Sequence, residues 1–427
     1  MQIKKSKHGL AKITLQIIAN DSEIESIKRH VVGHHAASSK IPGFRSGKAP
    51  LAIVERNADQ NALSNDFLDH ALNSLYRQAL ESEGLRPVGE PKVTLGKFVP
   101  YTTLEFEVET EVIGPIALPD YKKIRLPKPM VSVKTPDITK VLKTLQQRQA
   151  ERINVSRGVR NDDEVTIDFS ATDAKNQPIA GATGNDYPLI VGSNQFIPGF
   201  EANLLGVLPG KSTKFGINFP KDYQVASLAG QKANFEVKVK KVNQLKMQKL
   251  DDDFAKKSGP FKTLTELKAD IKKQLEADQR TAVERTYRND LVLKIADQAE
   301  LEVPASLVDE QVLSMEEEEK RNLSYKGVTW QEHLKNEGIN EEQHRQRHRP
   351  DAERGVKAGL VLSEIAQQEK IEITDQELTE RLQALKSQYK DPAMQAELDK
   401  PKAKDDIASQ IMTEKTIAKL VAYASGS

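Results

Sequence analysis

Cysteine is absent from this chain of 427 residues. The absence excludes disulfide frameworks, cysteine-based zinc sites and thiol nucleophiles, and it is typical of proteins kept in a reducing compartment. No apolar run approaches the roughly 18 residues that span a bilayer. The basic N-terminus also lacks the apolar core and the cleavage site of a secretory signal. We therefore expect a cytoplasmic protein with no membrane contact.

Aromatic residues are scarce, at 5% of the chain, whereas charged residues make up 29% and hydrophobic residues 38%. This balance is typical of a helix-rich protein with broad solvated surfaces and not of a compact enzyme with one large core. A chain of this length exceeds what one core supports, so roughly two to four domains are expected.

The net charge of +1 conceals a basic N-terminus. Residues 1–50 hold nine Lys or Arg residues against three acidic ones. Such a module favours a polyanionic partner such as nucleic acid. An ordinary Lys-rich solvated face has the same composition, so the charge count alone leaves both interpretations open.

Residues 1–112 show the pattern of a compact α+β unit in the order β-α-α-β-β. Alternating apolar residues predict strands at 13–17 and 104–108. Ser22 and Glu25 have the spacing of a capping box at the start of the first helix. A long second helix is predicted from apolar residues at helical spacing and a closing glycine: Leu63, Phe67, Leu72, Leu75, Tyr76, Ala79 and Gly84.

Three further regions follow along the chain. Prolines punctuate residues 113–156, which we interpret as a linker and one amphipathic helix. Residues 157–243 are rich in Phe and contain short alternating strands, which predicts a small antiparallel β domain. Residues 244–427 have a helical pattern almost throughout. The expected fold class is therefore α+β multidomain, with an inserted β domain and a long helical C-terminal domain.

An eight-residue loop, Gly43-Phe44-Arg45-Ser46-Gly47-Lys48-Ala49-Pro50, lies between the two predicted helices. Its two glycines and terminal proline indicate a tight, exposed turn whose tip offers one aromatic ring and two cations. Arg and Lys neutralise phosphates, and an aromatic ring stacks on an unpaired base. The alternative is a polar connector whose Phe44 folds back into the core, and spacing alone does not exclude it.

In its helix–loop–helix context, the motif Gly-Phe-Arg-x-Gly-x-x-Pro resembles the ribosome-binding signature of the bacterial trigger factor family. The resemblance covers the whole chain and implies an ATP-independent chaperone that docks on the large ribosomal subunit at the exit tunnel. Members of the family often carry Lys at the position of Ser46, although Lys48 keeps a cation nearby. The ribosome-binding residues implied by the resemblance are Gly43, Phe44, Arg45, Gly47, Lys48 and Pro50.

Residues 157–243 resemble an FKBP-type peptidyl-prolyl isomerase domain. The likeness is carried by the segments Val165–Ser170 and Val191–Phe200, together with Tyr223 and Phe235. It implies a shallow apolar cavity as the catalytic site. The residues that would line this cavity are Phe169, Ile179, Tyr187, Phe196, Ile197, Phe200, Tyr223 and Phe235.

The chemistry of such a site needs no general base and no nucleophile. Amide resonance sets a rotation barrier of about 18–20 kcal/mol, so unaided X–Pro isomerisation takes roughly tens to hundreds of seconds. A dry aromatic cavity favours the twisted amide, which has lost resonance, over the planar ground state. No cofactor and no metal are expected. The chain departs from the family at Ile179, where an aromatic residue is frequent, and at Ala180, where many members have Asp.

Three other patterns are given ordinary structural roles. The segment Gly206–Ser212 is one residue short of a phosphate-binding loop and contains a proline, so we interpret it as the turn before a strand at 213–219. His344 and His348 have a metal-ligand spacing, but the neighbouring arginines would repel a cation. The run Glu316–Glu319 is typical of a solvated helix face.

The helices of the C-terminal region carry no catalytic signature. Their scattered Leu and Met residues and long polar faces suit weak, multi-point contact with nascent and unfolded polypeptides. The resemblance implies arms and a cradle that hold such chains open, with roles in folding, protein export and cell division. Because no nucleotide site is predicted, release must follow from modest affinity. The sequence leaves open whether the free protein dimerises, although exposed apolar surface favours a weak homodimer off the ribosome.

Three alternatives remain on sequence grounds. The chain could be a dedicated prolyl isomerase whose flanking domains only localise it. It could be an RNA-binding assembly protein that uses the basic N-terminal module, which predicts tight, salt-sensitive binding to free RNA. A periplasmic chaperone with isomerase domains is a further class, against which the missing secretory signal argues.

Overall fold

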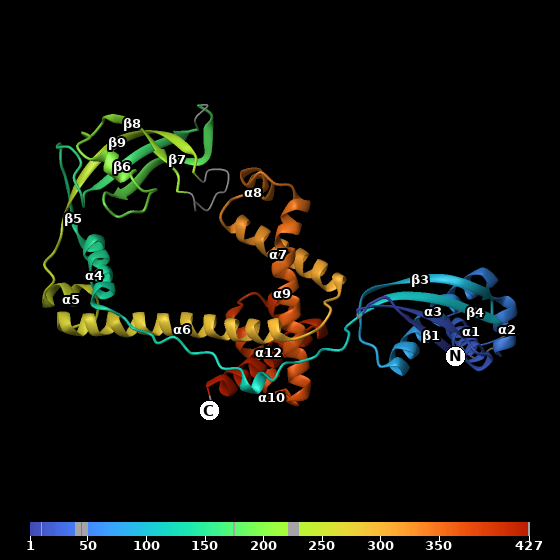
Figure 1. Ribbon diagram of the computed structural model, residues 1–427. Coiled ribbons are helices and arrows are strands. Elements are labelled where there is room, and N and C mark those ends of the chain that lie inside the picture. Colours follow the sequence, from blue (N-terminus) through green and yellow to red (C-terminus); the bar gives the residue numbers. More distant parts are fainter. Residues whose placement is uncertain (10, 39–43, 45–49, 174–175, 221–229, 426–427) are drawn as a thin grey trace. The chain divides into compact units, whose positions relative to one another are not determined.

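The computed structural model describes residues 1–9, 11–38, 44, 50–173, 176–220 and 230–425. These residues form two compact units. The first unit is built from residues 1–127, 288–319 and 345–427, and the second from residues 128–287 and 320–344. Figure 1 labels their elements along the chain. Within the described ranges, no helix combines the length and the apolar character needed to span a membrane.

The first unit begins with a four-stranded antiparallel sheet in the order β1-β2-β4-β3. Its strands are β1 (Gln2–Lys7), β2 (Lys12–Ile18), β3 (Pro87–Val99) and β4 (Thr103–Val112). The predicted alternation in β2 and β4 is confirmed, because every second residue is buried and the others face away. The inward residues are Ile13, Leu15, Ile17, Leu104, Phe106 and Val108.

Three helices contribute the rest of this core: α1 (Asp21–Ser38), α2 (Leu51–Asn57) and α3 (Gln60–Glu83). The long helix α3 was predicted, and it ends as expected at Gly84, whose φ of 62° is the left-handed conformation that glycine favours. The capping box was predicted two residues too late, at Ser22 and Glu25. Asn20 and Glu23 make the reciprocal bonds at the start of α1, with N···O distances of 3.0 Å each.

The first unit also holds most of the C-terminal helices. A short 3-10 turn, η1 (Tyr121–Lys123), lies in the proline-rich segment. The helices are the later part of α6 (Leu264–Gln298), most of α7 (Ala305–Tyr325) and of α9 (Glu341–Gln368), and then α10 (Asp375–Gln388), α11 (Pro392–Glu397) and α12 (Pro401–Ser425). The helical C-terminal region was predicted from its pattern.

One prediction for these helices is wrong. Glu316 in α7 was expected on a solvated face, but it is buried, with 3% of its surface exposed. The Arg345 guanidinium donates to both of its carboxylate oxygens, at 2.6 and 3.3 Å. A paired and hydrogen-bonded carboxylate can be buried where a bare one cannot.

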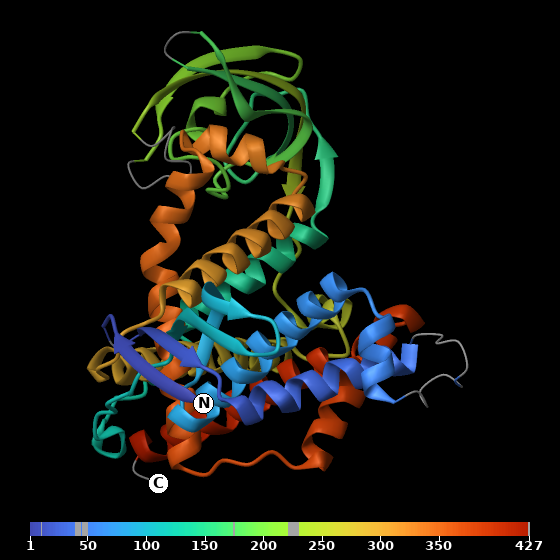
Figure 2. The same cartoon turned by 90° about the vertical axis from the view of Figure 1, so that its right-hand side faces the viewer.

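The second unit contains a five-stranded antiparallel sheet in the order β5-β9-β6-β7, with β8 also paired to β9. The strands are β5 (Glu151–Asn154), β6 (Glu164–Thr172), β7 (Pro178–Ile190), β8 (Ser212–Asn218) and β9 (Lys232–Lys246). The sheet is strongly curved in Figure 2, where it is drawn in green. A short helical turn, η2 (Glu201–Leu204), joins its core. The expected antiparallel β domain is confirmed.

The helices of the second unit form a separate apolar cluster. They are α4 (Thr135–Gln149), α5 (Asp252–Ser258), the earlier part of α6, and α8 (Trp330–Glu337). Leu142 of α4, Phe254 of α5 and Leu267 of α6 are buried together. The helix predicted after the prolines is therefore α4.

Candidate functional site

Five aromatic side chains of the second unit meet on the curved sheet, and we call them the aromatic cluster: Phe169, Tyr187, Phe196, Phe200 and Phe235. Phe169 lies edge-on to the rings of Tyr187 and Phe196, with centroids 5.9 and 5.2 Å apart. Phe200 stacks on Phe196 at 4.2 Å and meets Phe235 edge-on at 5.2 Å. These are the separations and angles at which aromatic rings attract one another.

Burial is graded across the aromatic cluster. Phe200 is fully buried and Phe235 is 5% exposed, whereas Phe169 and Phe196 are half-buried and Tyr187 is 40% exposed. The buried rings therefore form a floor, and the exposed ones form a rim. A chain segment that contacts the rim meets exposed aromatic carbon surface with buried apolar side chains behind it.

The other predicted lining residues fall into three groups. Ile179 on β7 is 8% exposed and Ile197 is half-buried, and both belong to the same apolar core as the cluster. Tyr223 lies outside the described residues. Ala180 lies in β7. The pattern-based prediction missed Phe215 on β8, which packs edge-on to Phe200 at 5.4 Å and stacks with Phe235 at 6.0 Å. Its signal was available, since Phe215 alternates inward in a predicted strand.

Charged groups near the cluster are paired with one another. Asp168, which precedes Phe169, accepts a hydrogen bond from the Asp186 backbone N–H at 2.8 Å and an ion pair from Lys240 at 2.9 Å. These two interactions hold the pKa of the Asp168 carboxyl below its usual range. The Asp168 carboxylate is thus committed to fixing β6 against β7 and β9. The rings of the aromatic cluster themselves offer apolar contact.

Within the loop from 43 to 50, the structure describes Phe44 and Pro50. Phe44 is 41% exposed, so it does not fold back into the core. Pro50 stands directly before α2, with a φ of −56°. Gly43, Arg45, Gly47 and Lys48, together with Ser46, lie outside the described residues.

The elements that flank this loop are tied to each other. Lys28 of α1 pairs with Glu55 of α2 at 2.8 Å, and its ammonium lies 5.0 Å from the centre of the Tyr101 ring. His35 of α1 contacts Asp66 of α3 at 2.6 Å. The helices that flank the loop are therefore held to one another.

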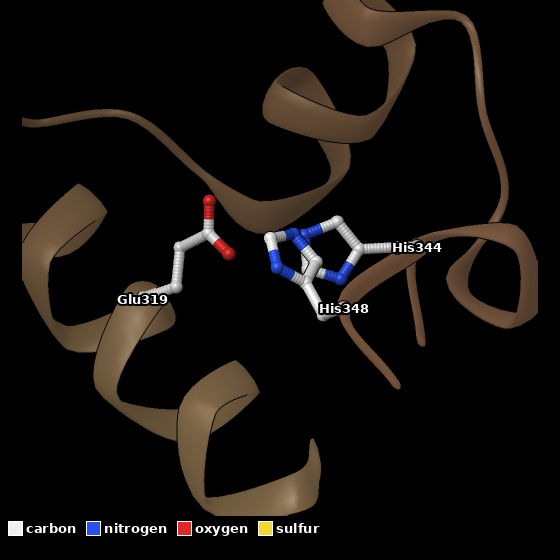
Figure 3. A group of neighbouring side chains, drawn as sticks. All are labelled: Glu319, His344 and His348. Atoms are coloured by element: carbon white, nitrogen blue, oxygen red, sulfur yellow. The ribbon is translucent and has the colours of Figure 1, made fainter. Parts of the chain in front are cut away.

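The structure also shows where the glycine-rich segment and the histidine pair lie. Gly206 and Gly210 have positive φ angles in the turn before β8, as expected for that segment. Figure 3 shows His344 and His348 one turn apart on α9, with Glu319 on α7. Glu319 and His348 belong to the first unit and His344 to the second. We assign no site to side chains divided in this way.

Family models match three parts of the chain. A model described as bacterial trigger factor protein matches residues 1–145, and a model of the C-terminus of the same protein matches residues 263–422. Between them, a model of FKBP-type peptidyl-prolyl cis-trans isomerases matches residues 156–240. The aromatic cluster lies inside this last match.

Full-length relatives carry the same name. Trigger factor of Alkaliphilus metalliredigens is 34% identical over 97% of each chain. Trigger factor of Caldicellulosiruptor bescii is 33% identical over 95% of this chain and 92% of its own. A solved structure concerned with promiscuous substrate recognition by the trigger factor chaperone is 18% identical, with a TM-score of 0.48 over 98% of this chain and 99% of its own. The chain therefore belongs to the bacterial trigger factor family, and it is a ribosome-associated chaperone that carries an FKBP-type peptidyl-prolyl isomerase.

Proposed function

We propose that the aromatic cluster, completed by Ile179, Ile197 and Tyr223, is the catalytic site of the isomerase. The observation that carries this proposal is the graded burial from Phe200 to Tyr187. A proline ring can rest on the accessible rings of the rim, which the buried floor supports, and so shield the X–Pro amide from water. Because the planar amide has more charge separation than the twisted one, a dry apolar surface lowers the rotation barrier.

The isomerase assignment is tested with Tyr187→Ala in the full chain. Tyr187 is 40% exposed, so its removal leaves the buried floor intact. We expect kcat/KM for a proline tetrapeptide to fall roughly tenfold, which corresponds to about 1.4 kcal/mol of transition-state stabilisation. The thermal unfolding of the domain should change little. A Tyr187→Ala protein with the wild-type kcat/KM would show that the catalytic site lies elsewhere.

We also propose that the loop from Gly43 to Pro50 docks the chain on the large ribosomal subunit beside the exit tunnel. Support comes from the exposed Phe44 ring, from the cations Arg45 and Lys48 in the same loop, and from the fixed helices on either side. Cations neutralise rRNA phosphates while an exposed ring stacks on a base. We infer accordingly that the protein is cytoplasmic and partly ribosome-associated, with weak homodimers off the ribosome.

Co-sedimentation with vacant ribosomes tests the docking loop. In the Phe44→Ala/Arg45→Ala protein, loss of one stacked ring and one phosphate contact should lower ribosome affinity roughly tenfold or more. The matched control is Tyr325→Ala/Lys326→Ala, which removes another adjacent aromatic residue and cation that are both exposed. If the loop variant co-sediments with ribosomes at the wild-type level, the proposed docking role is wrong.

We also propose that each segment of the chain has a separate function. Residues 1–112 serve ribosome binding, residues 113–156 link the domains, and residues 157–243 catalyse isomerisation. Residues 244–427 hold nascent and unfolded chains. The helices that flank the loop and the rings of the aromatic cluster belong to two separate apolar cores, which supports this division.

A further inference from the structure

Glu201 is a buried acid next to the floor of the aromatic cluster. It is the first residue of η2 and directly follows Phe200, and 7% of its surface is exposed. Its carboxylate meets a row of donors in the preceding loop. One oxygen accepts from the backbone N–H groups of Gly192 at 2.6 Å and Asn194 at 3.1 Å. The other accepts from Gln195 N–H at 2.9 Å, from Phe196 N–H at 3.4 Å and from the Ser193 hydroxyl at 3.3 Å.

The loop that these bonds hold has no regular structure of its own. It begins where β7 ends, and Gly192 and Asn194 have positive φ angles of 93° and 57°. Four of its backbone N–H groups donate to a side chain in place of strand or helix backbone. A single carboxylate accepts all four, and charge-assisted bonds of this kind are stronger than neutral ones. The conformation of the loop thus depends on one side chain.

Phe196 is the residue at the end of this loop, and its ring forms one wall of the aromatic cluster. It stacks on Phe200 at 4.2 Å and lies edge-on to Phe169 at 5.2 Å and to Tyr187 at 5.4 Å. Phe200 of the floor and Phe196 of the wall are therefore connected through Glu201. The chain links Phe200 to Glu201, and the Glu201 carboxylate links back to the backbone of Phe196.

We propose that Glu201 is a positioning residue of the isomerase, which sets the place of Phe196 and so shapes the site toward the residue that precedes proline. This inference rests on the proposed assignment of the aromatic cluster as the catalytic site. Catalysis by shape requires walls that are in place before the amide twists. A displaced Phe196 ring opens the half-buried rim, where the side chain before proline would lie.

The test compares Glu201→Gln and Glu201→Asp in the full chain. In Glu201→Gln, an amide NH2 replaces one oxygen, so two backbone N–H groups face a donor in place of an acceptor. Glu201→Asp keeps both oxygens on a side chain one methylene shorter. We expect kcat/KM to fall roughly 10- to 100-fold in Glu201→Gln, with a smaller loss in Glu201→Asp.

The diagnostic readout is selectivity among tetrapeptides with Ala, Leu or Phe before proline. A moved wall changes the ratio of kcat/KM between the Phe and Ala peptides. Val242→Ala, which removes buried volume from β9 of the same core, provides the control for destabilisation. If it lowers the rate at all, we expect the same factor for all peptides. Glu236→Gln makes the same chemical change at an exposed ion pair with Lys214 and should behave as wild type.

Two outcomes would overturn the proposal. One is a folded Glu201→Gln protein with the wild-type kcat/KM. The other is a Glu201→Gln protein that slows every peptide by the same factor, as Val242→Ala does, because Glu201 would then only stabilise the domain. Failure of the site assignment itself is seen separately, as an unchanged rate in Tyr187→Ala measured in the same assay.

Discussion

At the scale of single residues, Gly184 sets the position of Phe169 in the aromatic cluster. A Cβ atom added to Gly184 would lie 2.6 Å from Phe169 Cε1 and 2.9 Å from its Cζ, which is closer than carbon atoms pack. The ring would have to move, and it touches Tyr187, Phe196 and Phe200. We expect Gly184→Ala to destabilise the domain by about 1–3 kcal/mol and to lower its isomerase kcat/KM.

The matched control for Gly184→Ala is Gly216→Ala in β8. A Cβ atom at Gly216 would also come close to other atoms, at 2.9 Å from Lys232 Cε and 3.2 Å from Asn234 Oδ1, but both belong to the far ends of side chains that can turn. Gly216→Ala should therefore keep both stability and rate. Thermal unfolding and a tetrapeptide assay measure the two effects. Equal behaviour of the two variants would show that the Phe169 ring has room to shift without consequence.

The sequence predicted the aromatic residues of the cluster better than the side chains that fix their positions. Alternation in strands and the family resemblance identified Phe169, Phe200 and Phe235. Glu201 gave no local signal, because its partners are backbone amides of a loop whose fold cannot be read from residue type. The burial of Glu316 was missed for a related reason. Its partner Arg345 comes from another helix, and a run of four glutamates looks the same whether or not such a partner exists.

At the scale of elements, a buried carboxylate joins η1 to the ends of α9 and α12. The side chain of Glu369 is 8% exposed, and it pairs with Lys122 at 2.8 Å and Lys419 at 2.7 Å. The hydroxyl groups of Tyr121 and Tyr423 donate to its two oxygens at 2.7 and 2.8 Å. These interactions, the Lys122 bond first, hold the pKa of the Glu369 carboxyl far below its usual range. The proline-rich segment is thereby fixed to the C-terminal helices.

The depressed pKa of Glu369 predicts a dependence of stability on pH. The ionised carboxylate is favoured by the folded state, so its contribution is complete above the ordinary carboxyl pKa of about 4.3. It declines as the pH falls below that value toward the folded-state pKa. We expect Glu369→Gln to lower the stability by about 1–3 kcal/mol at pH 7, and the difference from wild type to shrink in acid.

Thermal unfolding at pH 7 and at acidic pH measures this difference. The exposed Glu372 lies three residues further on, and Glu372→Gln is the control for loss of one negative charge. It should show no gap at either pH. A gap between wild type and Glu369→Gln that widens on acidification would contradict the assigned pKa direction.

Whole elements were predictable where their pattern is long. The helix α3 runs for 24 residues with buried positions every fourth residue, and β2 alternates cleanly. The strand β1 was not predicted, because Gln2–Lys7 has one strongly apolar residue and three lysines. It is a strand because it pairs with β2 along its full length. The helix α2 is only seven residues long, too short for periodicity to mark.

At the scale of the whole molecule, the order of the domains was visible in the sequence and the assembly of the first unit was not. Changes of pattern near residues 157 and 244 mark the β domain. The first unit, however, combines residues 1–127, 288–319 and 345–427. Such an assembly depends on contacts between segments far apart in the chain, for which no local composition or spacing gives a signal.

The β domain has a core of its own, so it can be removed as a whole. Among the described residues, the buried members of that core lie between Val159 and Val242, and none of them belongs to the apolar clusters that contain Leu15, Leu142 or Val308. Ile153 lies opposite Gln244 in the pairing of β5 with β9. Deletion of residues 157–243 therefore joins two chain ends that are already neighbours. The deletion variant should lack isomerase activity and keep its remaining helices.

This deletion separates a chaperone from a dedicated isomerase. Holding of unfolded chains was assigned to residues 244–427, which the deletion leaves in place. We expect the variant to suppress aggregation of a proline-free client as wild type does, and to co-sediment with ribosomes equally well. Circular dichroism checks that helix content is retained. If suppression of aggregation disappears while helix content and ribosome binding persist, then client binding depends on the β domain, and the flanking domains serve mainly to place an isomerase at the ribosome.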